Sequence, residues 1–262
     1  MIALQYLSVV IFGLALGSFA TAMIHRIPRG LSWWSMPKKD KAVHRSACPH
    51  CKATLRLVDL IPLFSWLSTR GKCRYCAKAI GLRYPLTELG VVLACLATYA
   101  ILGFTSQAFF IMAAIPFLAA LLVIDLEHLI LPNQLVVIIA VIGMARLIYE
   151  LFLQRSFSIS YAMIEFIAGA VIYAAFIWGL GWIMTLVLKK EALGFGDVKF
   201  FAAAGLWLGL SNLAWFCMAA GVFGVAFGLA WQILRKDKIF PFGPSLIASL
   251  YVLLLLDGSL LP

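Results

Sequence analysis

Charged side chains are scarce in this chain. Only 12% of its 262 residues are Asp, Glu, Lys or Arg, and 64% are hydrophobic, whereas an ordinary globular domain has about 25% and about 45–50%. With a mean hydropathy of +1.01, this shortage of charge excludes a soluble domain. The composition predicts an all-α polytopic membrane protein.

Acidic residues are scarcer than basic ones. The chain has 11 Asp and Glu against 21 Lys and Arg, which gives a net charge of +10. In a soluble chain this balance would suggest a nucleic-acid partner. Here thirteen of the 21 basic residues lie between Arg26 and Arg83, the only long polar stretch. We therefore expect the charge to orient the chain among membrane lipids, with no nucleic acid bound.

Outside that stretch long polar runs are missing, and apolar segments predict about eight transmembrane helices. The first has no charge over about 23 residues, enough to cross a hydrocarbon core of about 30 Å. A cleavable signal peptide is disfavoured there, because positive charge follows the apolar core instead of preceding it. The predicted segments are 2–24, 86–103, 108–124, 131–152, 162–188, 198–210, 212–234 and 244–260.

This pattern predicts three parts: a first transmembrane helix (1–24), a polar insertion (25–85) and a seven-helix domain (86–262). If the sides of the membrane alternate, nineteen basic residues share the side of the insertion, and only Arg146 and Arg155 lie near the other side. The excess predicts a cytoplasmic insertion and both termini outside.

Four of the six cysteines form two C-x-x-C pairs in the insertion. Cys48 and Cys51 make one pair, Cys73 and Cys76 the other, and 21 residues separate the pairs. The spacing is close to that of two-knuckle zinc sites, in which four thiolates close a tetrahedral shell. Two disulfides or a redox pair are the alternative, which a reducing cytoplasm disfavours. We expect one structural Zn²⁺ with no open position for catalysis.

Two aspartates stand beside apolar segments. Asp125 follows the apolar run 117–124, and Asp197 belongs to a G-x-G-D sequence with Gly194 and Gly196. In the alternating topology both lie at the cytoplasmic face, where the glycines would leave the Asp197 carboxylate accessible to an extended substrate backbone. Two carboxylates that share a site can act as general base and general acid, as in aspartic proteases.

A plainer interpretation exists for the same aspartates. Each could merely cap a helix or pair with Lys199 or His128. A pair at one face, with one member in G-x-G-D, favours catalysis over this alternative.

With these motifs in order, the chain closely resembles the type IV prepilin peptidases, the leader peptidase/N-methyltransferases of type IV pilus and type II secretion systems. The resemblance runs nearly end to end. The matching stretches are Gly17-Ser18-Phe19, His25-Arg26-Ile27-Pro28, the four cysteines around Ile61-Pro62-Leu63-Phe64-Ser65-Trp66-Leu67, Arg70-Gly71-Lys72-Cys73, Arg83-Tyr84-Pro85-Leu86-Thr87-Glu88-Leu89, Ile124-Asp125 through Leu131-Pro132, Gly194-Phe195-Gly196-Asp197-Val198-Lys199 and Pro241-Phe242-Gly243-Pro244.

The resemblance implies a GxGD-type aspartic protease of the bacterial cytoplasmic (inner) membrane. It would cut the short basic leader from prepilins or pseudopilins after a glycine, and then methylate the new N-terminal residue with S-adenosylmethionine. The residues it assigns are Asp125 and Asp197 for catalysis, Gly194, Gly196 and Lys199 for active-site support, Cys48, Cys51, Cys73 and Cys76 for zinc, and Gly71 for the methyl-transfer loop.

Two features limit what the resemblance implies. Asn133 stands where many members carry Asp after Leu-Pro, and no G-x-G-x-x-G loop marks a site for the methyl donor. Two other functions stay open: a peptidase that does not methylate, and a polytopic transporter with a zinc-stapled loop. The absence of an internal repeat argues against the transporter, and the cysteine loop argues against the peptidase-only enzyme.

Overall fold

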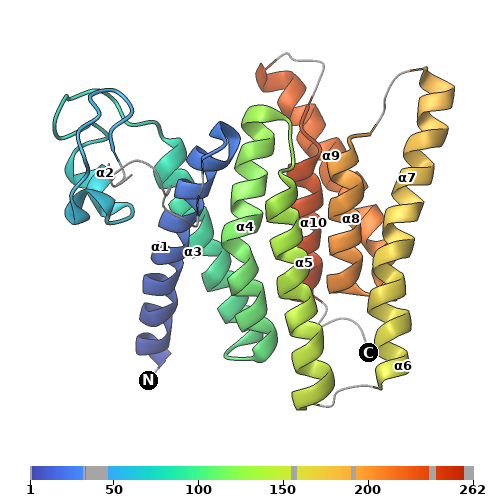
Figure 1. The fold of residues 1–262 in the computed structure, drawn as a ribbon. Helices are drawn as coiled ribbons and strands as arrows, with labels where there is room; N and C mark the ends of the chain where they lie inside the picture. The colour runs from blue at the N-terminus through green and yellow to red at the C-terminus, as the bar shows by residue number, and fades with distance from the viewer. Residues whose placement is uncertain are drawn as a thin grey trace. The chain divides into compact units, whose positions relative to one another are not determined.

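Apolar helices make up most of the structure, which is a computed structural model that describes residues 2–31, 33, 47–154, 158–189, 193–235 and 240–256. The chain forms two compact units, Met1–Ala100 and Ile101–Pro262. The predicted helical class is therefore found in the described residues (Figure 1). His44, Arg155, Lys190, Lys236, Lys238 and Asp257 lie outside the described residues.

The first unit has two long helices with the cysteine-bearing insertion between them. Its elements are α1 (Ile2–Arg26), the short 3₁₀ turns Ile27–Arg29 and η2 (Leu57–Leu60), α2 (Phe64–Ser68) and α3 (Arg83–Leu102). The insertion holds two isolated β-bridges, Ala47 with Thr54 and Lys72 with Ala79. Each bridge closes a hairpin around one C-x-x-C pair.

Helices α1 and α3 pack closely because α1 places glycines at the contact. A side-chain carbon at Gly17 would come within 2.9 Å of Glu88 Cα, and one at Gly13 within 3.1 Å of Val92 Cα. The spacing of four residues puts both glycines on one face of α1. The same register brings Tyr99 Oη to Gln5, where it donates a hydrogen bond of 2.9 Å to the side-chain oxygen.

The second unit is a bundle of helices. Its elements are α4 (Ser106–His128), α5 (Asn133–Ile148), a π-helical turn Tyr149–Gln154, α6 (Ile159–Ala162), a π-helical turn Met163–Ala168, α7 (Gly169–Leu188), α8 (Phe195–Leu208), a 3₁₀ turn Leu210–Asn212, α9 (Leu213–Arg235) and α10 (Gly243–Leu256). Helix α8 packs against α5, α7 and α10, and α10 packs against α4 and α9.

Six helices in the described residues are long and apolar enough to cross a membrane: Ile2–Arg29, Arg83–Leu102, Ser106–His128, Asn133–Leu153, Ile159–Leu188 and Leu210–Leu234. Helices α8 and α10 are also apolar, but each has 14 residues and rises about 21 Å, less than a core of about 30 Å. They correspond to the predicted segments 198–210 and 244–260, of which residues 257–260 lie outside the described part.

The two short helices lie in the interior of their unit. Eight of the 14 residues of α8 and nine of the 14 of α10 are buried, against three of 20 in α7. Their neighbours therefore cover much of their surface, so neither needs the length of a lipid-exposed helix.

One buried charge in this bundle is fully paired. Arg146 Nε lies 2.8 Å from Glu150 Oε1, and Arg146 Nη1 donates to the carbonyl oxygen of Trp207 at 2.9 Å. The Trp207 indole N–H donates to the carbonyl oxygen of Ile139 at 2.9 Å. This network joins α5 to α8 where an unpaired charge would be costly.

Candidate active site and metal centre

Asp125 lies inside helix α4, and its side chain is buried. The helix continues past it to His128, so Asp125 is not a residue after the helix, as the apolar run 117–124 suggested. Its Oδ2 accepts a hydrogen bond of 2.9 Å from the backbone N–H of Gly243, the first residue of α10. A free N–H at a helix N-terminus is a favourable partner for a carboxylate.

Only glycine fits at position 243. A side-chain carbon there would come within 2.5 Å of Asp125 Oδ2 and 3.1 Å of a Leu131 methyl group. The absence of a side chain lets the backbone of α10 reach the carboxylate directly. Gly243 thus positions Asp125, although only its place in Pro241-Phe242-Gly243-Pro244 drew attention to it in the sequence.

Asp197 lies in the first turn of α8, two residues after its N-terminus at Phe195. Its backbone N–H donates to the carbonyl oxygen of Gly194 at 3.1 Å, and a side-chain carbon at Gly194 would come within 3.3 Å of Asp197 Oδ2. The G-x-G-D sequence therefore forms a helix start in which the first glycine leaves room beside the carboxylate.

The two aspartates, 72 positions apart in sequence, are near neighbours in this unit. Leu131 lies between Gly243, which supports Asp125, and Gly196, which precedes Asp197. A side-chain carbon at either glycine would come within 3.1 Å of Leu131. The structure therefore brings the supports of the two aspartates together around Leu131.

Nearby cations bond to groups other than the aspartates. Lys199 Nζ donates to Asn133 Oδ1 at 2.8 Å and lies 4.7 Å from the centre of the Phe195 ring. His128 Nε2 lies 3.9 Å from Glu127 Oε2. Lys199 thereby joins the start of α8 to the start of α5, and the sequence did not point to Asn133 as its partner.

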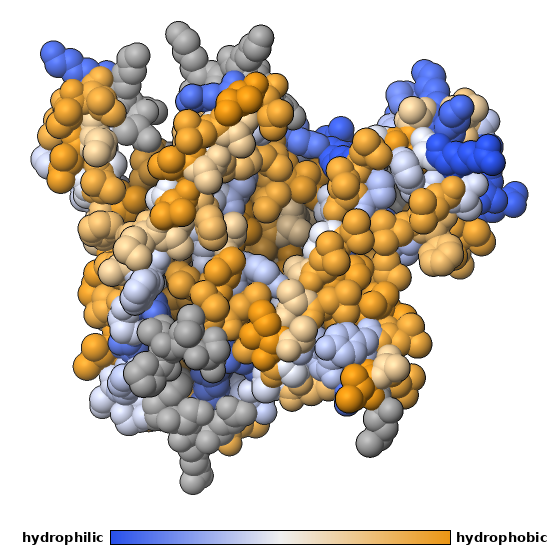
Figure 2. Space-filling model, turned by 180° about the vertical axis from the view of Figure 1, so that it is seen from behind, coloured by the Kyte–Doolittle hydropathy of each residue, from blue (hydrophilic) through white to orange (hydrophobic). Residues whose placement is uncertain are grey.

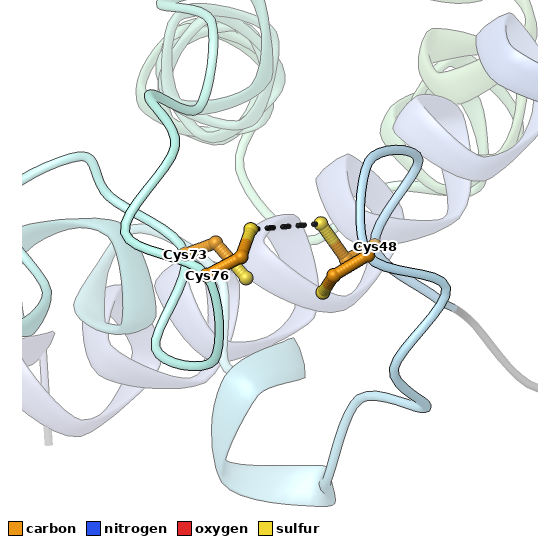
Figure 3. Close-up of side chains that lie close together, drawn as sticks. Cys48, Cys73 and Cys76 are labelled. Carbon is orange, nitrogen blue, oxygen red and sulfur yellow. Dashed lines mark hydrogen bonds between the residues drawn. The ribbon is translucent and has the colours of Figure 1, made fainter.

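In the first unit, the four predicted cysteines come together. Their Sγ atoms all lie within 4.8 Å of one another, and Cys48 Sγ is 3.9 Å from Cys76 Sγ (Figure 3). Four thiolates about 2.3 Å from one tetrahedral Zn²⁺ stand about 3.8 Å apart. The cluster can bind a metal ion, and its donor set and spacing suit zinc.

Both pairs of cysteines sit in the same type of hairpin. In the first, Cys48 N–H donates to Ala53 and Lys52 N–H to Cys48, each at 3.0 Å. In the second, Cys73 N–H donates to Lys78 at 2.8 Å and Ala77 N–H to Cys73 at 2.9 Å. The residue after each second cysteine, Lys52 or Ala77, has φ near +58°. These turns aim each pair of thiols to one side.

The thiols differ in acidity. Backbone N–H groups of Cys51 and His50, with the Cys73 and Cys51 thiols, lower the pKa of Cys48 to about 6. The Lys78 N–H lowers the pKa of Cys76, but burial and the neighbouring thiols outweigh it and raise that pKa to about 11. A second thiolate beside Cys48 is therefore disfavoured unless a cation is present, and a bound metal would supply one.

An ion pair braces the second hairpin against η2. Arg74 Nε lies 3.0 Å from Asp59 Oδ1, while Tyr75 Oη and the Arg56 N–H donate to Asp59 Oδ2 at 3.0 and 3.1 Å. Burial opposes ionisation of Asp59, but these hydrogen bonds and the Arg74 charge outweigh it and lower the pKa of the carboxyl. No motif in the sequence marks Asp59 for this role.

Gly71 has a clear packing role. Its φ is +68°, and a side-chain carbon there would come within 2.7 Å of the Trp66 ring. Its N–H donates to Trp66 at 2.8 Å, and its carbonyl oxygen accepts from Ile80 at 2.7 Å. Glycine is therefore required beneath the indole.

Comparisons with known proteins cover nearly the whole chain. Residues 11–102 match the bacterial peptidase A24 N-terminal domain, and residues 112–229 match the type IV leader peptidase family. A prepilin leader peptidase/N-methyltransferase of Aeromonas hydrophila is 34% identical over 98% of this chain and 92% of its own.

Two further relatives agree. A prepilin leader peptidase/N-methyltransferase of Burkholderia pseudomallei is 33% identical over 94% of this chain and 83% of its own. A type 4 prepilin-like proteins leader peptide-processing enzyme of Escherichia coli O78:H11 is 35% identical over 92% of this chain and 91% of its own. No solved structure gives a significant match.

Proposed function

The chain belongs to the type IV leader peptidase family, peptidase A24, and we propose that it cuts the short basic leader from prepilins or pseudopilins. Cleavage follows a glycine at the cytoplasmic face of the membrane. Asp125 and Asp197 are the catalytic pair. The observation that supports this proposal is that the Gly243 N–H, which holds Asp125, and the start of α8, which carries Asp197, both pack against Leu131.

The pair divides the chemistry of peptide hydrolysis. The ionised carboxylate takes a proton from water while the water oxygen attacks the scissile carbonyl carbon, and the protonated carboxyl gives its proton to the carbonyl oxygen. The C–N bond of the tetrahedral intermediate then breaks: its hydroxyl returns a proton to the second carboxylate as the carbonyl re-forms, and the proton taken from water passes to the leaving amine. Gly194 leaves room beside Asp197 for an extended substrate, and Gly196 lets Leu131 pack against the start of α8. Lys199 holds the α8 start through Asn133.

After cleavage, the same enzyme methylates the new N-terminal residue. This part rests on the family, whose named relatives are peptidase/N-methyltransferases. S-adenosylmethionine supplies the methyl group, and we place the methyl-transfer loop around Gly71. No other residue is assigned to the donor.

A single structural Zn²⁺ holds the insertion together through Cys48, Cys51, Cys73 and Cys76. With four protein ligands the ion has no open position, so its contribution is to the folding of the insertion. The cysteines lie in hairpins of the insertion, which contains neither catalytic aspartate, and this supports a structural role for the ion.

The proposed topology is eight spans in the bacterial inner membrane, with both termini outside and the insertion in the cytoplasm. The six long apolar helices, the buried α8 and α10, and the basic residues of 25–85 support it. A transporter would need ion ligands at an accessible midplane site. The binding of Asp125 to a helix N-terminus and the family membership favour the peptidase.

Co-expression with a prepilin, followed by mass analysis of its N-terminus, tests the proposal. We expect loss of the leader after a glycine and a mass increase of one methyl group on the new terminus. A cleaved but unmethylated product would leave a peptidase only. An intact leader, with the enzyme present in the membrane, would contradict the proposed function.

A further inference from the structure

An apolar surface lies on the otherwise polar insertion. It is formed by η2, α2 and the three residues between them, and we call it the apolar ridge. Its side chains are between 37% and 85% exposed: Leu57, Val58, Leu60, Ile61, Phe64 and Leu67. In Figure 2 the insertion, at the upper right, carries hydrophilic residues at its outer edge and hydrophobic residues along its lower edge. Such a patch marks an interaction surface.

Basic residues bracket the ridge. Arg56 precedes it and Arg70 follows it, and both are exposed. The one acid within it, Asp59, is already bonded to Arg74. Exposed apolar side chains flanked by cations are typical of segments that lie in the headgroup region of an anionic bilayer.

A hydrogen bond sets the depth of the ridge relative to α3. The backbone N–H of Leu63, between Ile61 and Phe64, donates to Glu88 Oε2 at 2.8 Å. Glu88 is five residues into α3, about 7.5 Å along the axis from Arg83. Arg83 donates to Tyr84 Oη at 3.1 Å, and such Arg and Tyr side chains mark a membrane interface.

Helix α1 gives the same depth. Glu88 packs at Gly17, nine residues before the end of α1 at Arg26 and so about 13 Å from it along the axis. Along both α1 and α3, Glu88, which accepts the hydrogen bond from Leu63, therefore lies on the membrane side of the charged helix ends. The ridge therefore lies at the level of the bilayer, beside the helices.

The backbone is bent to reach this position. Leu63 has φ +60° and ψ −49°, and Phe64 N–H bonds the carbonyl oxygen of Pro62 at 2.6 Å. This is the γ-turn that residues other than glycine rarely adopt. Glu88 holds the turn at its central N–H, and such strain persists where surrounding contacts enforce it.

We propose that the apolar ridge is a membrane anchor, inserted at the boundary between the headgroups and acyl chains of an anionic bilayer, and held at that depth by the hydrogen bond from Leu63 to Glu88. Arg56 and Arg70 face the lipid phosphates. The insertion is thus tied to the bilayer at its centre as well as through α1 and α3.

Photo-crosslinking of the full chain tests this anchor. The photoreactive residue p-benzoylphenylalanine is placed at position 64 or 67, and the protein is reconstituted in nanodiscs of phosphatidylglycerol and phosphatidylethanolamine. The matched control carries it at Thr54, an exposed position on the first cysteine hairpin. We expect several-fold more lipid adduct, measured by mass, from 64 and 67 than from 54.

Variants of Glu88 test the depth. Glu88→Ala removes the acceptor for Leu63 and should lower the adduct yield at 64 several-fold, whereas Glu88→Gln retains an oxygen acceptor and should stay near the parent. Equal yields in all three proteins would contradict the anchoring role of Glu88. Lipid adducts at 54 equal to those at 64 would contradict a localised ridge.

A measurement on the unmodified protein excludes misfolding as a cause. Hydroxyl-radical footprinting in nanodiscs should oxidise Tyr75, which is 42% exposed, more than Phe64, which is 69% exposed, because lipid covers only the ridge. Oxidation in the order of these exposed fractions would overturn the proposal. So would adducts at 64 that form with an added prepilin and not with lipid, since the ridge would then be a substrate-docking surface.

Discussion

In the cysteine hairpins each pair of thiols is oriented by backbone hydrogen bonds within six residues, Cys48 to Ala53 in one and Cys73 to Lys78 in the other. In the carboxylate pair, by contrast, Asp125 depends on a backbone N–H that lies 118 positions away, at Gly243. Each hairpin of the first region is assembled locally, and the four cysteines that result could be joined by a metal. The second exists only when α4, α8 and α10 are packed.

This difference predicts which substitutions should disrupt each region. A hairpin formed by local hydrogen bonds tolerates substitutions elsewhere in the chain. Loss of one cysteine should weaken binding of the cation, and thiolates that are left without a cation repel one another. The carboxylate pair needs no cation, but it depends on closely packed helices. A methyl group added at one of their contacts should therefore disrupt it. The two regions should therefore be separable by substitution.

The largest effect should come from the carboxylates. Asp125→Asn or Asp197→Asn should lower leader cleavage about 10²–10⁴-fold, the contribution of one proton-transfer group, and leave zinc content unchanged. Cleavage is measured by gel shift of a co-reconstituted prepilin. Asp59→Asn, a carboxylate change in the insertion, is the matched control and should retain cleavage. Near wild-type cleavage by Asp125→Asn or by Asp197→Asn would contradict the assignment of these two residues as the catalytic pair.

Next is the glycine that holds Asp125. Gly243→Ala puts a carbon within 2.5 Å of Asp125 Oδ2, and the displacement should lower cleavage about 10²-fold. Gly221→Ala in α9 is the control, because a carbon there would have no neighbour within 4 Å. If both variants cleave equally well, the close approach of α10 is not needed for catalysis.

The metal should show the opposite pattern. Freshly purified protein should carry about one zinc per chain by elemental analysis, and Cys48→Ser or Cys76→Ser should lose most of it. Methylation should fall at least as much as cleavage, because the carboxylates lie outside the insertion. Cys95→Ser, at a buried cysteine of α3, should keep the zinc. Metal-free wild-type protein would count decisively against the centre.

The smallest effect concerns leader charge. Glu127→Lys should lower cleavage of a basic-leader prepilin a few-fold more than cleavage of one with neutralised leader lysines, because exposed charge pairs contribute little. Glu127→Gln should lie between. Equal losses for both substrates would make Glu127 structural, as Glu88 already is through Leu63.

Much of the architecture was predictable because it depends on short-range patterns. The predicted helix over 2–24 corresponds to α1, Ile2–Arg26, and 212–234 to α9, Leu213–Arg235. The clustering of the four cysteines also followed from their spacing. Helix ends were less predictable: α4 continues through Asp125 to His128, since a single carboxylate with a buried partner does not stop a helix.

By itself, the sequence determined that the chain is helical and membrane-spanning, that four cysteines form one cluster, and that Asp125 and Asp197 are the acids to compare. Each of these follows from hydropathy or from spacing within a few tens of residues. Only the tertiary structure decided that Gly243 supports Asp125, that α8 and α10 are interior, and that Glu88 holds Leu63. These contacts join residues between 25 and 118 positions apart, and helix packing, which no local pattern encodes, brings them together.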